Sequence, residues 1–75
     1  MSNKYQPLPG DIVELREGMN KSSDKEEFRR FQAIYLRKAH NLSVKEISEI
    51  TCFSVGWIGQ LHSTYRHEGV NGLFS

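Results

Sequence analysis

Two serines within residues 42–65, LSVKEISEITCFSVGWIGQLHSTY, stand where helices commonly begin. Ser43 is followed three residues later by Glu46, the spacing of a capping box in which each side chain accepts a hydrogen bond from the other residue's backbone N–H. Ser54 is the second predicted N-cap. Because only two residues separate Ser54 from the end of the first predicted helix, the segment predicts two short helices that meet at a steep angle.

The apolar spacing gives these two helices their bounds and their buried faces. Residues 44–51 form the first predicted helix, with Val44 and Ile47 on one face. The second runs from about residue 55 to 67, and the spacing of Ile58, Leu61 and Tyr65 predicts that their face is buried. The opposite face is small and polar. This pattern is typical of a helix-turn-helix, whose second helix enters the DNA major groove.

Two further helices are expected upstream. An apolar stripe predicts a short helix over residues 12–19, opened by Asp11 with Glu14 and ended by a run of glycine, asparagine and serine. Ser23 or Asp24 then caps a long helix that reaches about residue 39, and Asn41 suits a left-handed residue after it. The predicted fold is all-α, a small bundle of three to four helices. We expect the domain to span residues 10–70, between a flexible tail at 1–9 and a C-terminal tail at 71–75.

Composition restricts the classes of protein to which the chain can belong. Seventy-five residues form one domain, and a single cysteine excludes an internal disulfide. No apolar run is long enough to span a bilayer, so we expect a cytoplasmic protein associated with the nucleoid. His62 and His67 are five residues apart, which does not place them on one helical face as metal ligands. We therefore expect no metal and no cofactor. Because 75 residues leave no room for a larger α/β catalytic scaffold, we also expect no enzymatic activity in this chain.

The charge is unevenly distributed, although the net charge is only +1. Residues 1–27 hold four Lys or Arg and six Asp or Glu, whereas residues 28–75 hold six Lys or Arg and three Asp or Glu. The basic half is thus the half that carries the predicted helix-turn-helix, as expected for a nucleic-acid-binding surface. The alternative is that these charges only solvate the surface.

Three stretches together resemble a known family: residues 28–43 (FRRFQAIYLRKAHNLS), residues 42–65, and residues 65–73 (YRHEGVNGL). They resemble the paired-type or homeodomain-like helix-turn-helix of bacterial insertion-sequence transposases, particularly the mariner-like group, over about residues 11–73. The resemblance implies a DNA-recognition domain that precedes a separate catalytic domain. At the helix contact, where this family commonly has alanine, the chain has Ser48, and at the turn, where glycine is common, it has Cys52. Cysteine adopts a positive φ only at some cost, so we expect a slightly strained turn.

The outward face of the last predicted helix supplies the candidates for contact with DNA base edges. These are Val55, Gly56, Gly59, Gln60 and Ser63. Gln60 is the best candidate for a direct contact, because its amide can pair with adenine N6 and N7. Gly56 and Gly59 either let the helix backbone approach DNA closely, or serve helix packing, or are merely tolerated. Trp57 either packs against the preceding helix or flanks the groove.

A second group of residues is expected to contact phosphates. It comprises Lys45, Ser54, Arg66 and His67. Lys45 opens the helix that crosses the DNA backbone, and the N–H groups after Ser54 can hold a phosphate. The long helix carries four more basic residues, Arg29, Arg30, Arg37 and Lys38, of which one or two could extend the phosphate contacts.

The leading hypothesis is sequence-specific binding to double-stranded DNA, of a terminal inverted repeat as the resemblance implies. A small transcriptional regulator is the alternative within the same class. A protein-interaction or dimerisation module is the alternative from another class, since the modest net charge is compatible with a homodimer or with docking to a further domain of a parent protein.

Overall fold

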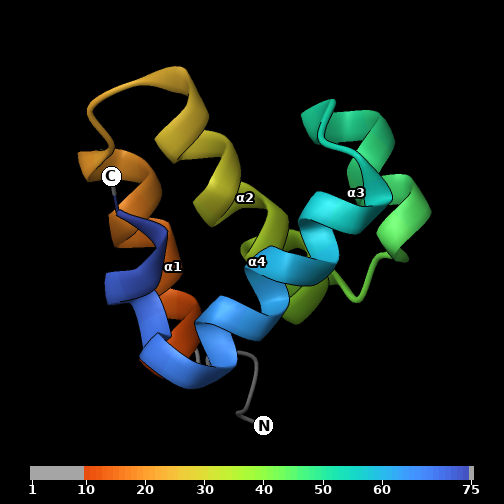
Figure 1. The fold of residues 1–75 in the computed structure, drawn as a ribbon. Coiled ribbons are helices and arrows are strands. Elements are labelled where there is room, and N and C mark those ends of the chain that lie inside the picture. The colour runs from red at the N-terminus through yellow and green to blue at the C-terminus, as the bar shows by residue number, and fades with distance from the viewer. Residues whose placement is uncertain (1–9, 75) are drawn as a thin grey trace, which may run out of the picture.

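Residues 10–74 form four α-helices and a closing 3-10 helix in a computed structural model, with no strand within this range (Figure 1). The elements are α1 (Gly10–Lys21), α2 (Lys25–His40), α3 (Val44–Thr51), α4 (Val55–Glu68) and η1 (Gly69–Leu73). α1 and α2 lie side by side, and α4 crosses in front of α2 while η1 returns toward α1. The all-α prediction is confirmed. The predicted tail at residues 1–9 lies outside the described range.

Local hydrogen bonds explain where α2 begins and ends. Asp24, not Ser23, is the N-cap, because its carboxylate accepts a hydrogen bond from the Glu27 backbone N–H at 2.8 Å. The Glu27 carboxylate in turn accepts from the Ser23 backbone N–H at 2.7 Å, which holds the α1–α2 connection in place. Asn41 ends the helix with φ of 54°, the left-handed conformation expected for it.

The two serine caps that define α3 and α4 are both formed. The Ser43 hydroxyl accepts from the Glu46 backbone N–H at 3.1 Å, and the Glu46 carboxylate accepts from the Ser43 backbone N–H at 2.9 Å. The Ser54 hydroxyl accepts from the Trp57 backbone N–H at 3.1 Å. These bonds satisfy N–H groups that the first helical turn leaves unpaired. α3 therefore has the predicted bounds, and α4 ends one residue beyond the predicted end.

The hydrophobic core contains residues from every element of the bundle. Its buried members are Leu15, Phe31, Ala33, Ile34, Ile47, Ile58, Leu61 and Leu73. α1 approaches α2 closely because Gly18 lies against the Phe31 ring, where a Cβ atom would overlap the ring. Gly18 is thus an interior residue of α1, which continues to residue 21, and the predicted helix end at residue 19 was wrong. The residue was expected to break the helix, whereas it makes helix packing possible.

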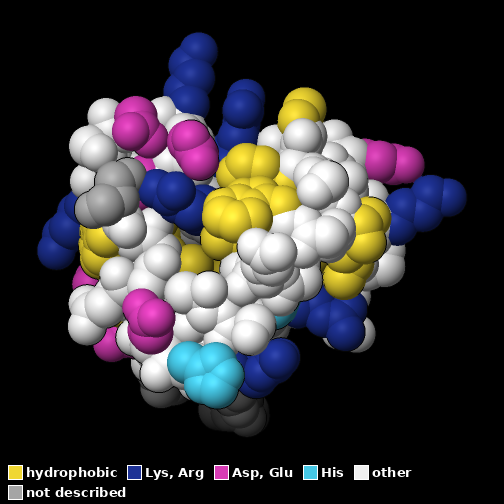
Figure 2. Space-filling model, viewed as in Figure 1, with side chains coloured by type: hydrophobic (Ala, Val, Ile, Leu, Met, Phe, Trp, Pro, Cys, Tyr) yellow, Lys and Arg dark blue, Asp and Glu magenta, His cyan; other side chains and the backbone are white. Residues whose placement is uncertain are grey.

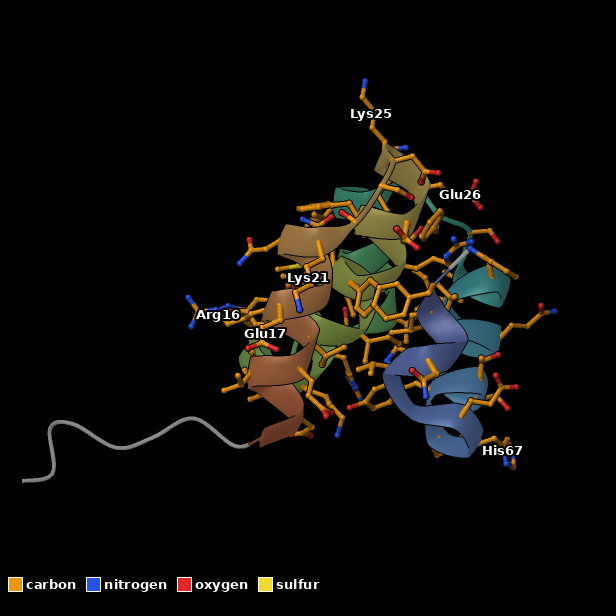
Figure 3. All side chains as sticks on the ribbon, turned by 90° about the vertical axis from the view of Figure 1, so that its left-hand side faces the viewer. Arg16, Glu17, Lys21, Lys25, Glu26 and His67 are labelled. Carbon is orange, nitrogen blue, oxygen red and sulfur yellow. The ribbon has the colours of Figure 1, made fainter. Side chains whose placement is uncertain are left out.

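The start of α1 also differs from the prediction. The helix begins at Gly10, so Asp11 lies in its first turn and does not precede it as a cap. The Asp11 carboxylate accepts from the Ile12 backbone N–H at 3.0 Å and lies 3.0 Å from the Lys38 ammonium, so it connects α1 to α2. The hydrogen bond from Lys38 lowers the pKa of Asp11. Figure 3 shows that the other charged residues labelled on α1, Arg16, Glu17 and Lys21, project away from the core.

The end of the described chain is part of the fold. Gly69 has φ of 68° and ψ of −155°, a region that essentially only glycine occupies, and the chain turns there into η1 instead of continuing as a free tail. Leu73 is fully buried, and the Phe74 ring lies edge-on to Phe31 with 4.9 Å between ring centroids. The predicted domain end at residue 70 therefore cuts through η1, and residues 71–74 belong to the packed unit.

None of the helices in the described range combines the length and apolar composition needed to cross a bilayer.

Candidate nucleic-acid interface

The connection between α3 and α4 is held by side-chain hydroxyls. Cys52 adopts φ of 68°, as the turn requires, and its backbone N–H donates to the Ser48 carbonyl at 2.9 Å. The Ser48 hydroxyl donates to the Phe53 carbonyl at 2.6 Å, and Thr51 Oγ1 accepts from the Phe53 N–H at 3.3 Å while donating to the Ile47 carbonyl at 2.8 Å. The strained turn was predicted; the hydroxyl bonds that fix it were not.

These bonds matter because they set the direction of α4. Ser48 occupies the helix contact where the resembled transposase family commonly has alanine, and alanine could not bond to the turn. The hydroxyl of Ser48 binds the carbonyl directly after the left-handed Cys52. A net stabilisation of about 0.5–1.5 kcal/mol from such a bond can offset the cost of a cysteine at positive φ.

α4 buries one face and presents the other. Ile58 and Leu61 lie in the core, and Tyr65 packs at its edge. At 100° per residue, the opposite arc carries Gly56, Gln60 and the neighbouring small residues. Figure 2 shows this side of α4 as small, mostly uncharged side chains and backbone.

The structure places all five candidates for base contact on α4. Val55 is 54% exposed, Gly56, Gly59 and Gln60 are exposed, and Ser63 is half-buried on the same arc, two turns after Gly56. A Cβ atom added to Gly56 or Gly59 would meet no heavy atom within 4 Å outside its own helix. Helix packing therefore gives no reason for either glycine, although each costs α4 roughly 1 kcal/mol relative to alanine. The open space around the two glycines fits both approach to a partner and simple tolerance of glycine at these positions.

The predicted phosphate contacts lie around this face. Lys45 is exposed in the first turn of α3, and Ser54 caps α4. Arg66 and His67 are exposed in the last turn of α4, where cations also interact favourably with the helix dipole. Figure 3 shows His67 pointing away from the body of the protein. Lys45, Arg66 and His67 are thus exposed on two helices that pack against each other.

Trp57 lies beside this face. Its ring is edge-on to Phe53 with 6.3 Å between centroids, so it packs against the turn before α4. With 36% of its surface exposed, it still borders the outward face. Trp57 thus has a structural contact with Phe53, and the rest of its ring is accessible to a partner.

The sequence does not show which of the four basic residues of α2 lie near α4, and the structure does. Arg30 Nε donates to the Leu73 carbonyl at 3.1 Å and thereby holds the C-terminal segment. Arg29 lies with Phe28 near the start of α2. Arg37 and Lys38 instead lie next to the C-terminal half of α4. No pattern in the sequence distinguishes these positions, because the distinction depends on how α4 crosses α2.

No group of three His, Cys, Asp or Glu residues within the described range is arranged to hold a metal ion.

A model of the homeodomain-like domain matches residues 24–74, which is most of the chain and includes α2, α3, α4 and η1. The chain belongs to the homeodomain-like family. No curated protein and no solved structure matches it. Within this homeodomain-like domain, α3 and α4 form the helix-turn-helix, and α1 lies outside the matched region. Helix-turn-helix domains of this kind are DNA-binding modules, so the family and the geometry indicate the same partner.

Proposed function

We propose that this homeodomain-like domain binds double-stranded DNA sequence-specifically, as the DNA-recognition domain of a transposase that binds terminal inverted repeats. α4 enters the major groove, and Gln60 contacts a base edge. Lys45 and Arg66 contact phosphates on either side. Catalysis would belong to another domain of the parent protein, and the complex would form in the cytoplasm on the nucleoid.

The observation that carries this proposal is the outward face of α4. Its two glycines face open space, and Gln60 is the long amide side chain on the exposed arc. A helix without side chains at two positions can bring its backbone close to base edges, while a glutamine can make a bidentate contact with adenine. The domain has little net charge, so the isolated unit is expected to bind weakly.

Selection of binding sites from a pool of randomised duplexes tests the proposal. A single enriched sequence is expected, with affinity that falls as salt rises. Gln60→Ala should weaken binding to the selected duplex by roughly 1–3 kcal/mol and leave random duplex almost unaffected. Lys45→Ala is the matched control for phosphate contact, because it should weaken both duplexes alike. Equal losses on both duplexes with Gln60→Ala would exclude its base contact.

Two further results separate the alternatives. Occurrence of the selected sequence in inverted repeats that flank the parent gene supports the transposase role. Occurrence upstream of other genes instead supports a regulator. Absence of salt-dependent duplex binding at low ionic strength would favour the protein-interaction module.

A further inference from the structure

An open pocket of about 470 Å³ lies between the C-terminal end of α2 and the C-terminal half of α4. It is lined by Arg37, Lys38, His62, Tyr65, Arg66 and Gly69. Three of these residues are cations and none is a carboxylate. In Figure 2, Lys and Arg side chains gather along the lower edge of α4, next to a histidine. The lining therefore favours an anion.

The three cations differ in how much of their charge is available. Lys38 is paired with Asp11 at 3.0 Å, and its ammonium lies 5.6 Å from the centroid of the Tyr65 ring. Arg37 donates from Nη1 to the Leu42 carbonyl at 2.9 Å, which leaves most of its five N–H donors unused. Arg66 makes no hydrogen bond or ion pair with any residue from 10 to 74. Arg37 and Arg66 therefore supply most of the available positive charge.

Two polar groups in the lining can complete an anion site. His62 Nδ1 lies 3.0 Å from the Ile58 carbonyl, whereas its Nε2 is shielded from solvent and has no partner within the described chain. Nε2 is therefore the polar atom of His62 that still lacks a partner among the described residues beside the pocket. Burial raises the pKa of Tyr65, so its hydroxyl keeps the proton that it can donate.

The pocket borders the open face of α4. Arg66 lies seven residues after Gly59, nearly two full turns, and is therefore on the same side of the helix. A duplex seated on the exposed arc would bring its backbone along this edge. We propose that the pocket holds one phosphate of the DNA backbone between Arg37 of α2 and Arg66 of α4. This inference rests on the proposed function, and it adds a DNA contact from outside the helix-turn-helix.

The other exposed arginine of α2 provides a matched control. Arg29 lies with Phe28 in a separate pocket near the start of the helix, whose lining includes Asp24. It shares the helix, the charge and the exposure of Arg37, but it does not line the pocket beside α4. If only total positive charge matters, Arg29→Gln and Arg37→Gln should weaken DNA binding equally. If the pocket holds a phosphate, Arg37→Gln should weaken it more.

The test measures binding to a mixed-sequence duplex by fluorescence anisotropy over a salt series. It compares the wild-type chain with Arg37→Gln, Arg66→Gln, the double variant and Arg29→Gln. Loss of one phosphate contact should lower the slope of log affinity against log salt by about 0.9. We expect this loss for the double variant, with each single variant giving part of it and Arg29→Gln giving none. Melting temperatures verify that each variant is folded.

A second arm uses inorganic phosphate with the wild-type chain, following the His62 ring and Gly69 amide signals by NMR. Shifts in these signals that Arg37→Gln abolishes support an anion site in the pocket. If the duplex slopes of the Arg37 and Arg29 variants coincide, the DNA contact is overturned, even where free phosphate binds. If wild-type binding to duplex shows no salt dependence, the proposed function itself fails, and the phosphate arm still decides whether the pocket binds anions.

Discussion

The hairpin of α1 and α2 and the hairpin of α3 and α4 use glycine in opposite ways. Gly18 in α1 faces inward and lets the Phe31 ring of α2 lie where a side chain would otherwise be. Gly56 and Gly59 in α4 face outward and touch nothing outside their helix. Both hairpins pack apolar side chains into the core and have hydrogen bonds at their connections. They differ in that the glycine of the first lies inside the helix contact, whereas the glycines of the second leave one face of α4 unobstructed.

The difference shows what each hairpin contributes to the domain. Close packing in the first stabilises the fold directly, and a change there should be measured as lost stability. In the second, the glycines of α4 lower helix stability, while Ser48 and Thr51 hold the turn that orients the helix. We infer that stability has been given up there in favour of an accessible surface.

The largest expected effect is on the first hairpin. Gly18→Ala would place a Cβ within the Phe31 ring, so α1 must move away from α2. We expect the free energy of unfolding to fall by about 1–3 kcal/mol, as for other overpacked cores. Urea denaturation of the variant measures this. Gly56→Ala is the matched control and should be neutral or stabilising, and equal losses in the two variants would remove the contrast between the hairpins.

A smaller effect is expected at the turn of the second hairpin. Ser48→Ala removes the hydroxyl that donates to the Phe53 carbonyl, so the variant should lose about 0.5–1.5 kcal/mol of stability. Ser63→Ala removes a hydroxyl with no hydrogen bond to the described part of the chain and serves as control. Thermal unfolding compares the two. If both melt as the wild type does, the bond at Ser48 does not hold the turn.

The smallest effect concerns the strained residue of that turn. Cys52 adopts φ of 68°, so Cys52→Gly should raise the free energy of unfolding by up to about 1 kcal/mol by relieving the steric cost. Cys52→Ala keeps a Cβ and should bring no such gain. A glycine variant that melts at or below the wild-type temperature would mean that the packing of the Cys52 side chain outweighs its strain.

Local chemistry explains which parts of the fold the sequence predicted. The caps at Ser43, Ser54 and Asp24 depend on residues three positions apart, and Asn41 depends on its own backbone preference. All four form as the local pattern predicts, with Asp24 selected over Ser23. Such features need no information about the tertiary structure.

Features that depend on contacts distant in sequence were missed. Gly18 resembles a helix breaker until Phe31, thirteen residues later, is placed against it. Leu73 belongs to a segment that resembles a tail, yet it completes the core beside α2 and α4. The candidate site shows the same division. The outward arc of α4 follows from helical periodicity, whereas the position of Arg37 beside Arg66 follows from the crossing of two helices.

The central claim is that the open face of α4 is the surface that meets DNA. Gly59→Ala tests it most directly when unfolding and affinity for the selected duplex are measured on the same preparation. The account predicts a rise in stability of up to about 1 kcal/mol together with a roughly 5- to 150-fold loss of affinity, because the new methyl group would hold the helix away from the groove. Gly10→Ala, in open space on α1, should leave the affinity unchanged. A stabilised Gly59→Ala variant that binds the duplex as tightly as the wild type would contradict the account.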